Sequence, residues 1–435
     1  MLAMVWPGAP DPPIRTEVVV LRSRIELMVF VRDPHVPPLL WGLRSERPPL
    51  PASLLFAGTD FRTMTVLVHE LAHDLSEWFL PLQPRWYSEG VATFLETLQY
   101  DRSNGRAQIG EPSWERYNDS AWSRGLPASD LLTARQFPSS DKMAEFEDRS
   151  WLLVHYLINK RPEAFARLQT ELLGLESPAE AWSTALPDLP PSKLDGVLDQ
   201  YRSGRYETQV WRVHVPAPAI SVRTMTDAEA HEVRALLFET GAAPGVAPDS
   251  AAAQKEIGEA LEADPSNVEA LALRFFWFSP VVGPQDRAGL AQRAVSAHPD
   301  EWIAWLMVAS AAADQRAKRT ALARGLALAP NQAPLLTEMA RLDATTGHWE
   351  EALLFATKAT QFGERRWGAL ALRAEALARL GKCGDADKLA GALQTLAPPE
   401  VADAVTRGWS ALRQSCAEVA ERAGRAAVPT GTIGP

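Results

Sequence analysis

Apolar residues recur at helical spacing over two neighbouring stretches of the chain, 61–79 and 85–99. In the first stretch these residues are three or four positions apart, which predicts a helix that buries one side. They are Met64, Val68, Leu71 and Leu75. Pro81 and Pro84 predict the end of this helix, because proline is disfavoured inside a helix. The pattern therefore predicts a pair of consecutive helices joined by a short, proline-containing turn.

The regions on either side of this helix pair are predicted to be mixed. Residues 14–32 are rich in β-branched side chains and partly alternate, which predicts one or two strands, and a short strand is expected at 54–57. A turn followed by a short extended piece is expected at 104–110. Further helices are expected at 142–159, 162–173, 178–186 and 191–203. Residues 208–215 alternate like a strand and lead into Pro216 and Pro218, which predicts a domain boundary.

From about residue 227 the chain is Ala-rich and repeats. Pro265, Pro299 and Pro330 end similar segments and are 34 and then 31 residues apart. A period near 34 predicts paired antiparallel helices stacked as a solenoid. Gly347-His348-Trp349 and Gly381-Lys382-Cys383 are 34 residues apart and resemble the turn of a tetratricopeptide repeat. The resemblance is to degenerate repeats, because the first two segments lack this turn.

Length and charge limit the possible classes of function. The 435 residues allow two or three domains, and the net charge of −10 contains no block of like charges. This composition argues against nucleic acid and anionic membranes as main partners, because both require clustered Lys and Arg. No apolar run approaches the roughly 20 residues of a membrane span. The first residues lack the pattern of a secretory signal, so we expect a soluble protein with no export address.

The two cysteines, Cys383 and Cys416, match the spacing of no zinc signature. Two interpretations remain open. Buried free thiols in helices are the favoured one on general burial statistics. A single disulfide between neighbouring helices is the alternative, and it would indicate an oxidising compartment.

The candidate chemistry lies in the first helix of the pair, in His69-Glu70-Leu71-Ala72-His73. Residues four apart on a helix project from one face, so both imidazoles can contact one metal ion. Glu70 lies beside them, near the water of such a site, without having to be a ligand. Glu89 in the second helix can supply a third ligand and leave the fourth position for water. This combination predicts a zinc hydrolase.

The same residues resemble the gluzincin metallopeptidases and, more closely, the peptidase MA-like domain of bacterial proteins that carry tetratricopeptide repeats. The matching segments are 69–73, 80–81, 84–96, 109–110 and 150–157. The resemblance covers about residues 50–205. It implies a Zn2+ site held by His69, His73 and Glu89, with Glu70 as general base.

The resemblance also implies a fold and an organisation. We expect an α+β zincin-like metallopeptidase domain, mostly helical, followed by an all-α tetratricopeptide-like solenoid. The expected parts are an irregular N-terminus at 1–13, the peptidase domain at 14–207, a linker with a strand and a helix at 208–246, helical repeats at 247–424 and a disordered tail at 425–435. The substrate would be a peptide or protein, and the repeats would recruit a protein partner or substrate. Relatives of this kind are commonly exported to the periplasm or cell envelope.

Several roles remain open at this stage. Asp74, Glu96 and Thr93 are candidates for orienting the ligands. Many gluzincins use a Tyr or His to stabilise the oxyanion, and residues 146–151 contain no Tyr where relatives often have one. The possible substitutes are Tyr87, His155, Tyr156 and Arg149. The missing Tyr favours a second hypothesis, a non-catalytic scaffold with a vestigial zinc site, and a zinc hydrolase acting on a non-peptide amide is a third.

Overall fold

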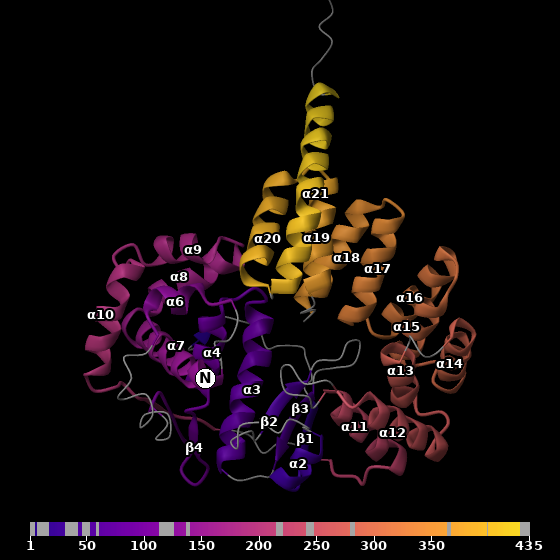
Figure 1. The fold of residues 1–435 in the computed structure, drawn as a ribbon, viewed down its shortest axis with the longest axis horizontal. Helices are drawn as coiled ribbons and strands as arrows, with labels where there is room; N and C mark the ends of the chain where they lie inside the picture. The colour runs from indigo at the N-terminus through magenta and orange to yellow at the C-terminus, as the bar shows by residue number, and fades with distance from the viewer. Residues whose placement is uncertain are drawn as a thin grey trace, which may run out of the picture. The chain divides into compact units, whose positions relative to one another are not determined.

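The computed structural model describes residues 5–6, 17–30, 42–45, 53–57, 61–112, 126–135, 140–214, 221–240, 248–278, 283–362, 367–397 and 399–426. Over these residues the protein is mostly helical, with two small three-stranded sheets (Figure 1). None of the described helices combines the length and the hydropathy that crossing a membrane requires. The predicted tail at 425–435 lies almost entirely outside the described residues.

The contacts within the chain define two units, and each unit combines segments that are distant in sequence. Unit 1 comprises Met1–Pro12, Ala72–His214 and Asp343–Pro435, and unit 2 comprises Pro13–Leu71 and Val215–Leu342. The division falls inside helix α3 (Phe61–Phe79), which is continuous. The linear domain boundaries predicted from the sequence remain predictions.

Unit 2 contains a sheet with the strand order β1-β3-β2. β1 (Glu17–Leu21) pairs with β3 (Ser53–Ala57) in parallel, and β2 (Gly42–Ser45) pairs with β3 in antiparallel orientation. The expected strand at 54–57 is confirmed by β3. The prediction of one or two strands in residues 14–32 is confirmed for one strand, β1, and a helix follows it.

That helix, α2 (Arg24–Phe30), begins with a variant of the capping box, in which Glu26 accepts from the N–H of Arg22 and not from that of the cap residue Ser23. The backbone N–H of Glu26 donates to Ser23 Oγ at 3.3 Å, and the N–H of Arg22 donates to Glu26 Oε2 at 2.8 Å. These two bonds satisfy amide groups at the start of the helix, where no backbone acceptor is available. Leu27 and Phe30 lie on one face three residues apart and are buried.

The remaining elements of unit 2 are helices, each of which packs against the next one in the chain from α11 to α16. They are α11 (Asp227–Thr240), α12 (Ser250–Ala263), α13 (Val268–Trp277), α14 (Pro284–Ala297), α15 (Trp302–Ala311), α16 (Gln315–Leu328) and most of α17 (Ala333–Thr345), whose residues from Asp343 onward belong to unit 1. The N-terminal elements share their core, since Phe30 packs edge-on against Phe238 of α11 at 4.9 Å. This packing of each helix against the next agrees with the stacked helices that the 34-residue period predicts.

Unit 1 holds the second helix of the predicted pair. The helices are α4 (Arg85–Leu95), α6 (Ala128–Thr133), α7 (Ser140–Lys160), α8 (Pro162–Leu173), α9 (Pro178–Ala185) and α10 (Pro191–Arg202). All the predicted helices of this region are confirmed, and most bounds agree within two residues. α4 is four residues shorter than expected, because β4 (Gln99–Asp101) begins where the helix was predicted to end.

A second sheet in unit 1 has the order β4-β5-β6. β6 (Gln209–Arg212), the strand expected at 208–215, pairs antiparallel with β5 (Arg106–Ile109), so that Ala107 faces Trp211. The N–H of Val213 extends this pairing with a 2.8 Å bond to the carbonyl of Gly105. Residues on both sides of the predicted boundary at 207 therefore form one sheet.

The C-terminal helices of unit 1 also pack in sequence, from α18 (Trp349–Gln361) through α19 (Trp367–Arg379) and α20 (Cys383–Leu396) to α21 (Pro399–Ala426). Gly347 and Gly381 adopt φ values of +79° and +73°, which glycine adopts readily after the end of a helix. The spacing of 34 residues therefore marks two equivalent turns. Cys383 and Cys416 form a disulfide that joins α20 to α21, so the free-thiol interpretation is wrong.

Candidate metal centre

Helix α3 carries both histidines of the motif. The prediction that this helix buries the side of Met64, Val68, Leu71 and Leu75 is wrong, because Met64 is 47% exposed and the other three are only partly buried. The buried residues described in this helix are Ala72, Asp74 and Ser76. His69 and His73 are separated by one helical turn, and both are partly exposed. Glu70 follows His69 in the same helix and is also partly exposed. One continuous helix therefore fixes the spacing between the two imidazoles.

Helix α4 carries the carboxylate of Glu89. The helix begins after Pro84, whose extended backbone (φ −61°, ψ 147°) turns the chain into it. Glu89 is only 3% exposed, although a carboxylate is normally solvated. The next residue, Gly90, approaches α7 so closely that a Cβ there would lie 2.5 Å from the carbonyl oxygen of Ser150. This close packing fixes the backbone at Glu89 relative to α7.

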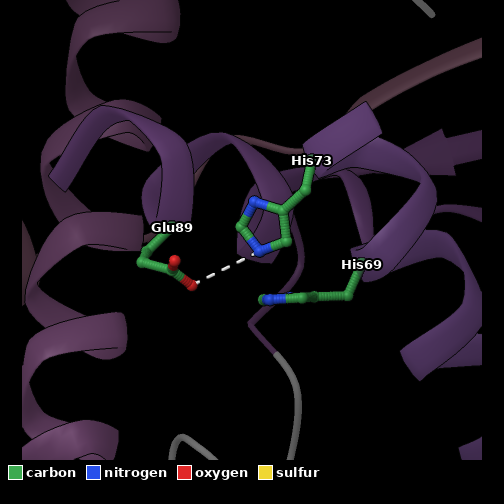
Figure 2. A group of neighbouring side chains, drawn as sticks. All are labelled: His69, His73 and Glu89. Atoms are coloured by element: carbon green, nitrogen blue, oxygen red, sulfur yellow. Dashed lines mark ion pairs between the residues drawn. The ribbon is translucent and has the colours of Figure 1, made fainter. Parts of the chain in front are cut away.

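The three predicted ligands lie together. One ligand atom each from His69, His73 and Glu89 can be chosen so that all lie within 4.8 Å of one another. His73 Nε2 is 3.5 Å from Glu89 Oε2. Figure 2 shows both rings and the carboxylate directed toward the same space, the rings from one helix and the carboxylate from the other.

The donor set fits a zinc ion. Two imidazole nitrogens and one carboxylate oxygen are ligands that Zn2+ uses in catalytic sites. Two atoms bound at about 2.1 Å to a tetrahedral ion are separated by about 3.4 Å, close to the distance between His73 Nε2 and Glu89 Oε2. His73 and Glu89 therefore already have the separation of two ligands on one ion, and His69 lies within 4.8 Å of both.

Ser88 orients His73, and the sequence reading did not identify it. Its hydroxyl lies 3.0 Å from His73 Nδ1, and Ser88 is 7% exposed. When Nδ1 carries the proton and donates it to Ser88 Oγ, the lone pair of Nε2 faces Glu89. The position of Ser88 directly before Glu89 could have drawn attention to it in the sequence. Its contact with His73 becomes visible only in the fold.

The residues predicted to orient the ligands are all buried: Asp74 is 2% exposed, Glu96 is 7% exposed and Thr93 is 1% exposed. Thr93 lies one turn after Glu89, and its hydroxyl has no hydrogen-bond partner among the described residues. A buried hydroxyl without a partner is unfavourable, which is compatible with a ligand-orienting role when the site is filled. Arg85, one turn before Glu89, places its Nε 3.8 Å from Glu89 Oε1. Burial lowers the pKa of Arg85, and the neighbouring Glu89 opposes that shift.

Two of the four possible oxyanion donors are engaged in the core. The hydroxyl of Tyr87 accepts bonds from Trp6 Nε1 at 2.9 Å and from Gln169 Nε2 at 2.8 Å, and burial raises its pKa. His155 Nε2 donates to the carbonyl of Gly110 at 2.9 Å, and its Nδ1 is 2.8 Å from the hydroxyl of Tyr201. Burial lowers the pKa of His155 to about 4, so its ring is neutral at physiological pH.

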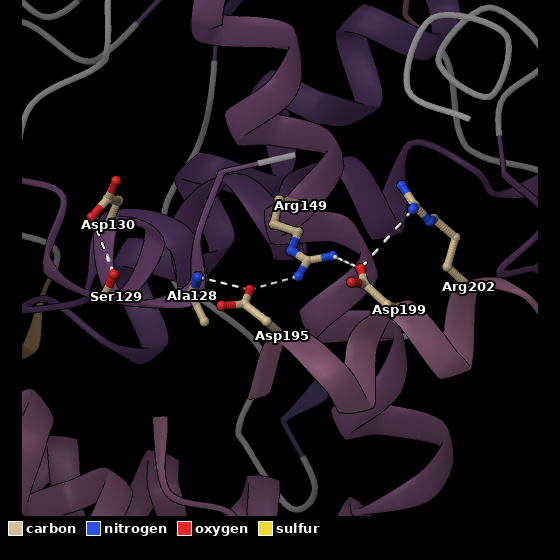
Figure 3. Close-up of polar contacts among 7 residues, drawn as sticks. All are labelled: Ala128, Ser129, Asp130, Arg149, Asp195, Asp199 and Arg202. Carbon is tan, nitrogen blue, oxygen red and sulfur yellow. Dashed lines mark hydrogen bonds and ion pairs between the residues drawn. The ribbon is translucent and has the colours of Figure 1, made fainter. Parts of the chain in front are cut away.

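The other two donors are also committed elsewhere. Arg149 on α7 binds two carboxylates of α10, Asp195 at 2.8 Å and Asp199 at 3.1 Å (Figure 3). Tyr156 accepts a 3.4 Å bond from Arg161 and packs edge-on against Tyr201. These contacts of the four candidates are thus with residues other than His69, His73 and Glu89, but the hydroxyl hydrogens of Tyr87 and Tyr156 and the Nε of Arg149 are not used in these bonds.

A second cluster in unit 2 has ligand-type atoms within the same distance: His231, Glu256 and Glu259. Its carboxylates already have cationic partners. Arg234 donates to Glu256 at 2.9 Å, and Lys255 lies 2.9 Å from Glu259. We interpret this cluster as an ion-pair network that joins α11 to α12.

Comparisons with known proteins give little further information. No protein-family model matches the chain, and no curated protein matches it. Among solved structures, the crystal structure of MamA is similar with a TM-score of 0.26 and 18% sequence identity, over 40% of this chain and 91% of MamA. A TM-score this low establishes neither a shared fold nor a shared function.

Proposed function

We propose that the protein is a zinc-dependent metallopeptidase of the gluzincin type. The observation that carries the proposal is the convergence of His69, His73 and Glu89 within 4.8 Å. The placement of Ser88 supports it further, because ligating histidines usually donate their second N–H to an acceptor. These four residues come from two helices, α3 and α4, and α4 is packed closely against α7 at Gly90.

In this proposal the residues of the chain have separate tasks. His69, His73 and Glu89 would hold the ion, and Ser88 and Arg85 would orient two of the ligands. A bound zinc ion would lower the pKa of a water molecule toward ~7 and polarise the scissile carbonyl. Glu70 would accept the proton of the attacking water and later deliver it to the leaving amine.

The helical repeats are proposed to recruit a protein partner or a substrate. The support is the consecutive packing of helices within each unit, an arrangement that presents extended surfaces in repeat proteins. The class of partner is a protein, since the net charge of −10 disfavours nucleic acid.

Comparison of the wild type with Glu70→Gln tests the proposal. We expect both proteins to bind about one equivalent of zinc by metal analysis, and only the wild type to cleave a diverse peptide library. Glu163→Gln, at an exposed position on α8, is the matched control and should behave as wild type. Zinc in both proteins with cleavage by neither would refute the peptidase. Absence of zinc from the wild type would refute the site itself.

The alternative is a non-catalytic scaffold with a vestigial zinc site. One observation favours it: the hydrogen bonds of the four candidate oxyanion donors are with residues other than the three ligands, so no donor is yet assigned to the oxyanion. Since removing one such donor costs about a hundredfold or more in rate, their absence would leave a weak enzyme. The comparison with Glu70→Gln separates the two functions, because a scaffold binds zinc but does not cleave peptides at any protein concentration.

A further inference from the structure

Unit 1 contains a cavity of about 710 Å3 between α6, α8, α9 and the end of α20. Its floor is formed by five apolar side chains that are each at most 4% exposed: Trp86, Leu168, Leu172, Trp182 and Leu186. Protein interiors are close-packed, and few voids exceed the size of a water molecule. A space of this volume lies in the range of small-molecule sites, which are mostly apolar with a few polar groups.

The polar groups around the cavity are already used. The indole N–H of Trp182 donates to the carbonyl of Leu189 at 2.8 Å. Five hydroxyl groups line the wall, and each donates to an acceptor close by in its own segment. These residues are Ser129, Thr133, Ser177, Ser183 and Thr395. Prolines such as Pro190 and Pro191 contribute further wall without an N–H. A ligand inside the cavity therefore meets almost no free donors.

Arg135 is the one charged residue among the described residues that line the cavity. It is exposed, and its guanidinium donates one bond to the carbonyl of Gln394 on α20. A guanidinium has five N–H donors, so it can also bind an anion. The preceding helix α6 is anchored, because Asp195 accepts the N–H of Ala128 at 2.9 Å and also binds Arg149 (Figure 3).

We propose that this cavity binds an amphiphile with a long acyl chain and an anionic head group. The chain would occupy the apolar floor, and the head would lie against Arg135. An apolar peptide fits less well, because each of its backbone amides needs a hydrogen-bond partner that the prolines and committed hydroxyls do not provide. This inference does not depend on the metal centre or on peptidase activity.

Calorimetric titration of the full-length protein with octanoate, dodecanoate and palmitate tests the proposal. Affinity should rise up to about fourfold for each added methylene until the cavity is filled. Arg135→Gln should weaken palmitate binding about tenfold, because it removes a charge-assisted hydrogen bond. Arg167→Gln, an exposed arginine of α8 that does not line the cavity, should leave binding unchanged. Ala179→Trp, at an exposed lining position, should shorten the preferred chain.

Further titrations test which anionic head group is preferred and whether a neutral alcohol or an apolar peptide binds instead. Palmitoyl lysophosphatidate carries the same chain with a phosphate head, so comparison with palmitate shows which anion is preferred, and binding of either one supports the proposal. Three results would overturn it: hexadecanol binding as tightly as palmitate, no increase with chain length, or an acetylated and amidated apolar peptide binding more tightly than both amphiphiles. Circular dichroism verifies that each variant is folded.

Discussion

Replacement of Gly90 by alanine tests whether the position of Glu89 depends on the close contact between α4 and α7. The new Cβ would lie 2.5 Å from the carbonyl oxygen of Ser150, 2.5 Å from Val154 Cγ2 and 2.9 Å from the carbonyl carbon of Ser150. Carbon atoms are at optimal separation at about 3.5–4.0 Å, so α4 has to move away from α7 by about 1 Å. Val154 can change its rotamer, but the backbone of Ser150 cannot.

The expected free energy follows from two opposing terms. Overpacking of this kind costs about 1–3 kcal/mol, and the clash with backbone atoms places Gly90→Ala at the upper end. Alanine in a helix regains about 1 kcal/mol relative to glycine. The net loss in the free energy of unfolding is therefore about 2 kcal/mol. Because ligand distances must hold within about 0.2 Å, the same shift should weaken zinc binding at least tenfold.

Urea unfolding followed by circular dichroism, together with zinc titration against a chelator, measures both effects. Gly196→Ala is the matched control, since Gly196 also lies inside a helix but a Cβ there meets nothing within 4 Å. That variant should be more stable than wild type by about 0.5–1 kcal/mol. Wild-type stability and zinc affinity in Gly90→Ala would refute the view that close helix packing positions Glu89.

Three further predictions address other contacts. Ser88→Ala should weaken zinc binding about tenfold in the chelator titration, and an unchanged affinity would mean that its bond to His73 has no orienting role. Replacement of both Cys383 and Cys416 by serine should lower the free energy of unfolding by up to about 3.7 kcal/mol for a loop of 33 residues. Reduction of the wild type with dithiothreitol should give the same loss. Burial lowers the pKa of His155 from 6.5 to about 4. Between pH 6.5 and about 4 the unfolded chain binds a proton at His155 that the folded chain does not. The free energy of unfolding should therefore fall as the pH is lowered through this range, by up to about 3 kcal/mol. His155→Gln should remove this pH dependence of stability.

The local elements near the metal centre were predictable because short-range signals specify them. The apolar spacing of α3 and the prolines after it determine where that helix lies, and prolines also mark the first turns of α8, α9 and α10. The capping box of Ser23 and Glu26 is equally local. The sequence contains this signal, but the β-branched residues around it led to the prediction of a strand.

Contacts between distant residues could not be predicted in the same way. The indole of Trp6 reaches the hydroxyl of Tyr87 across 81 positions of sequence, although its proline-rich surroundings predicted an irregular segment. The bond between Ser88 and His73 depends on how α4 packs against α3, and the disulfide depends on how α20 packs against α21. Hydrophobic spacing predicts that a helix has a buried face, but it does not specify which helix covers that face. In α3 the exposed Met64 shows that even the buried face depends on such contacts.

The pairing of β6 with β5 has a practical consequence for dissecting the chain. A fragment that ends at residue 207 would lose β6 and leave the backbone of Arg106–Ile109 as an open strand edge. Open edges recruit strands from other molecules and promote aggregation. A fragment that extends through His214 keeps both the ladder and the bond between Val213 and Gly105, and we expect it to aggregate less than the shorter one.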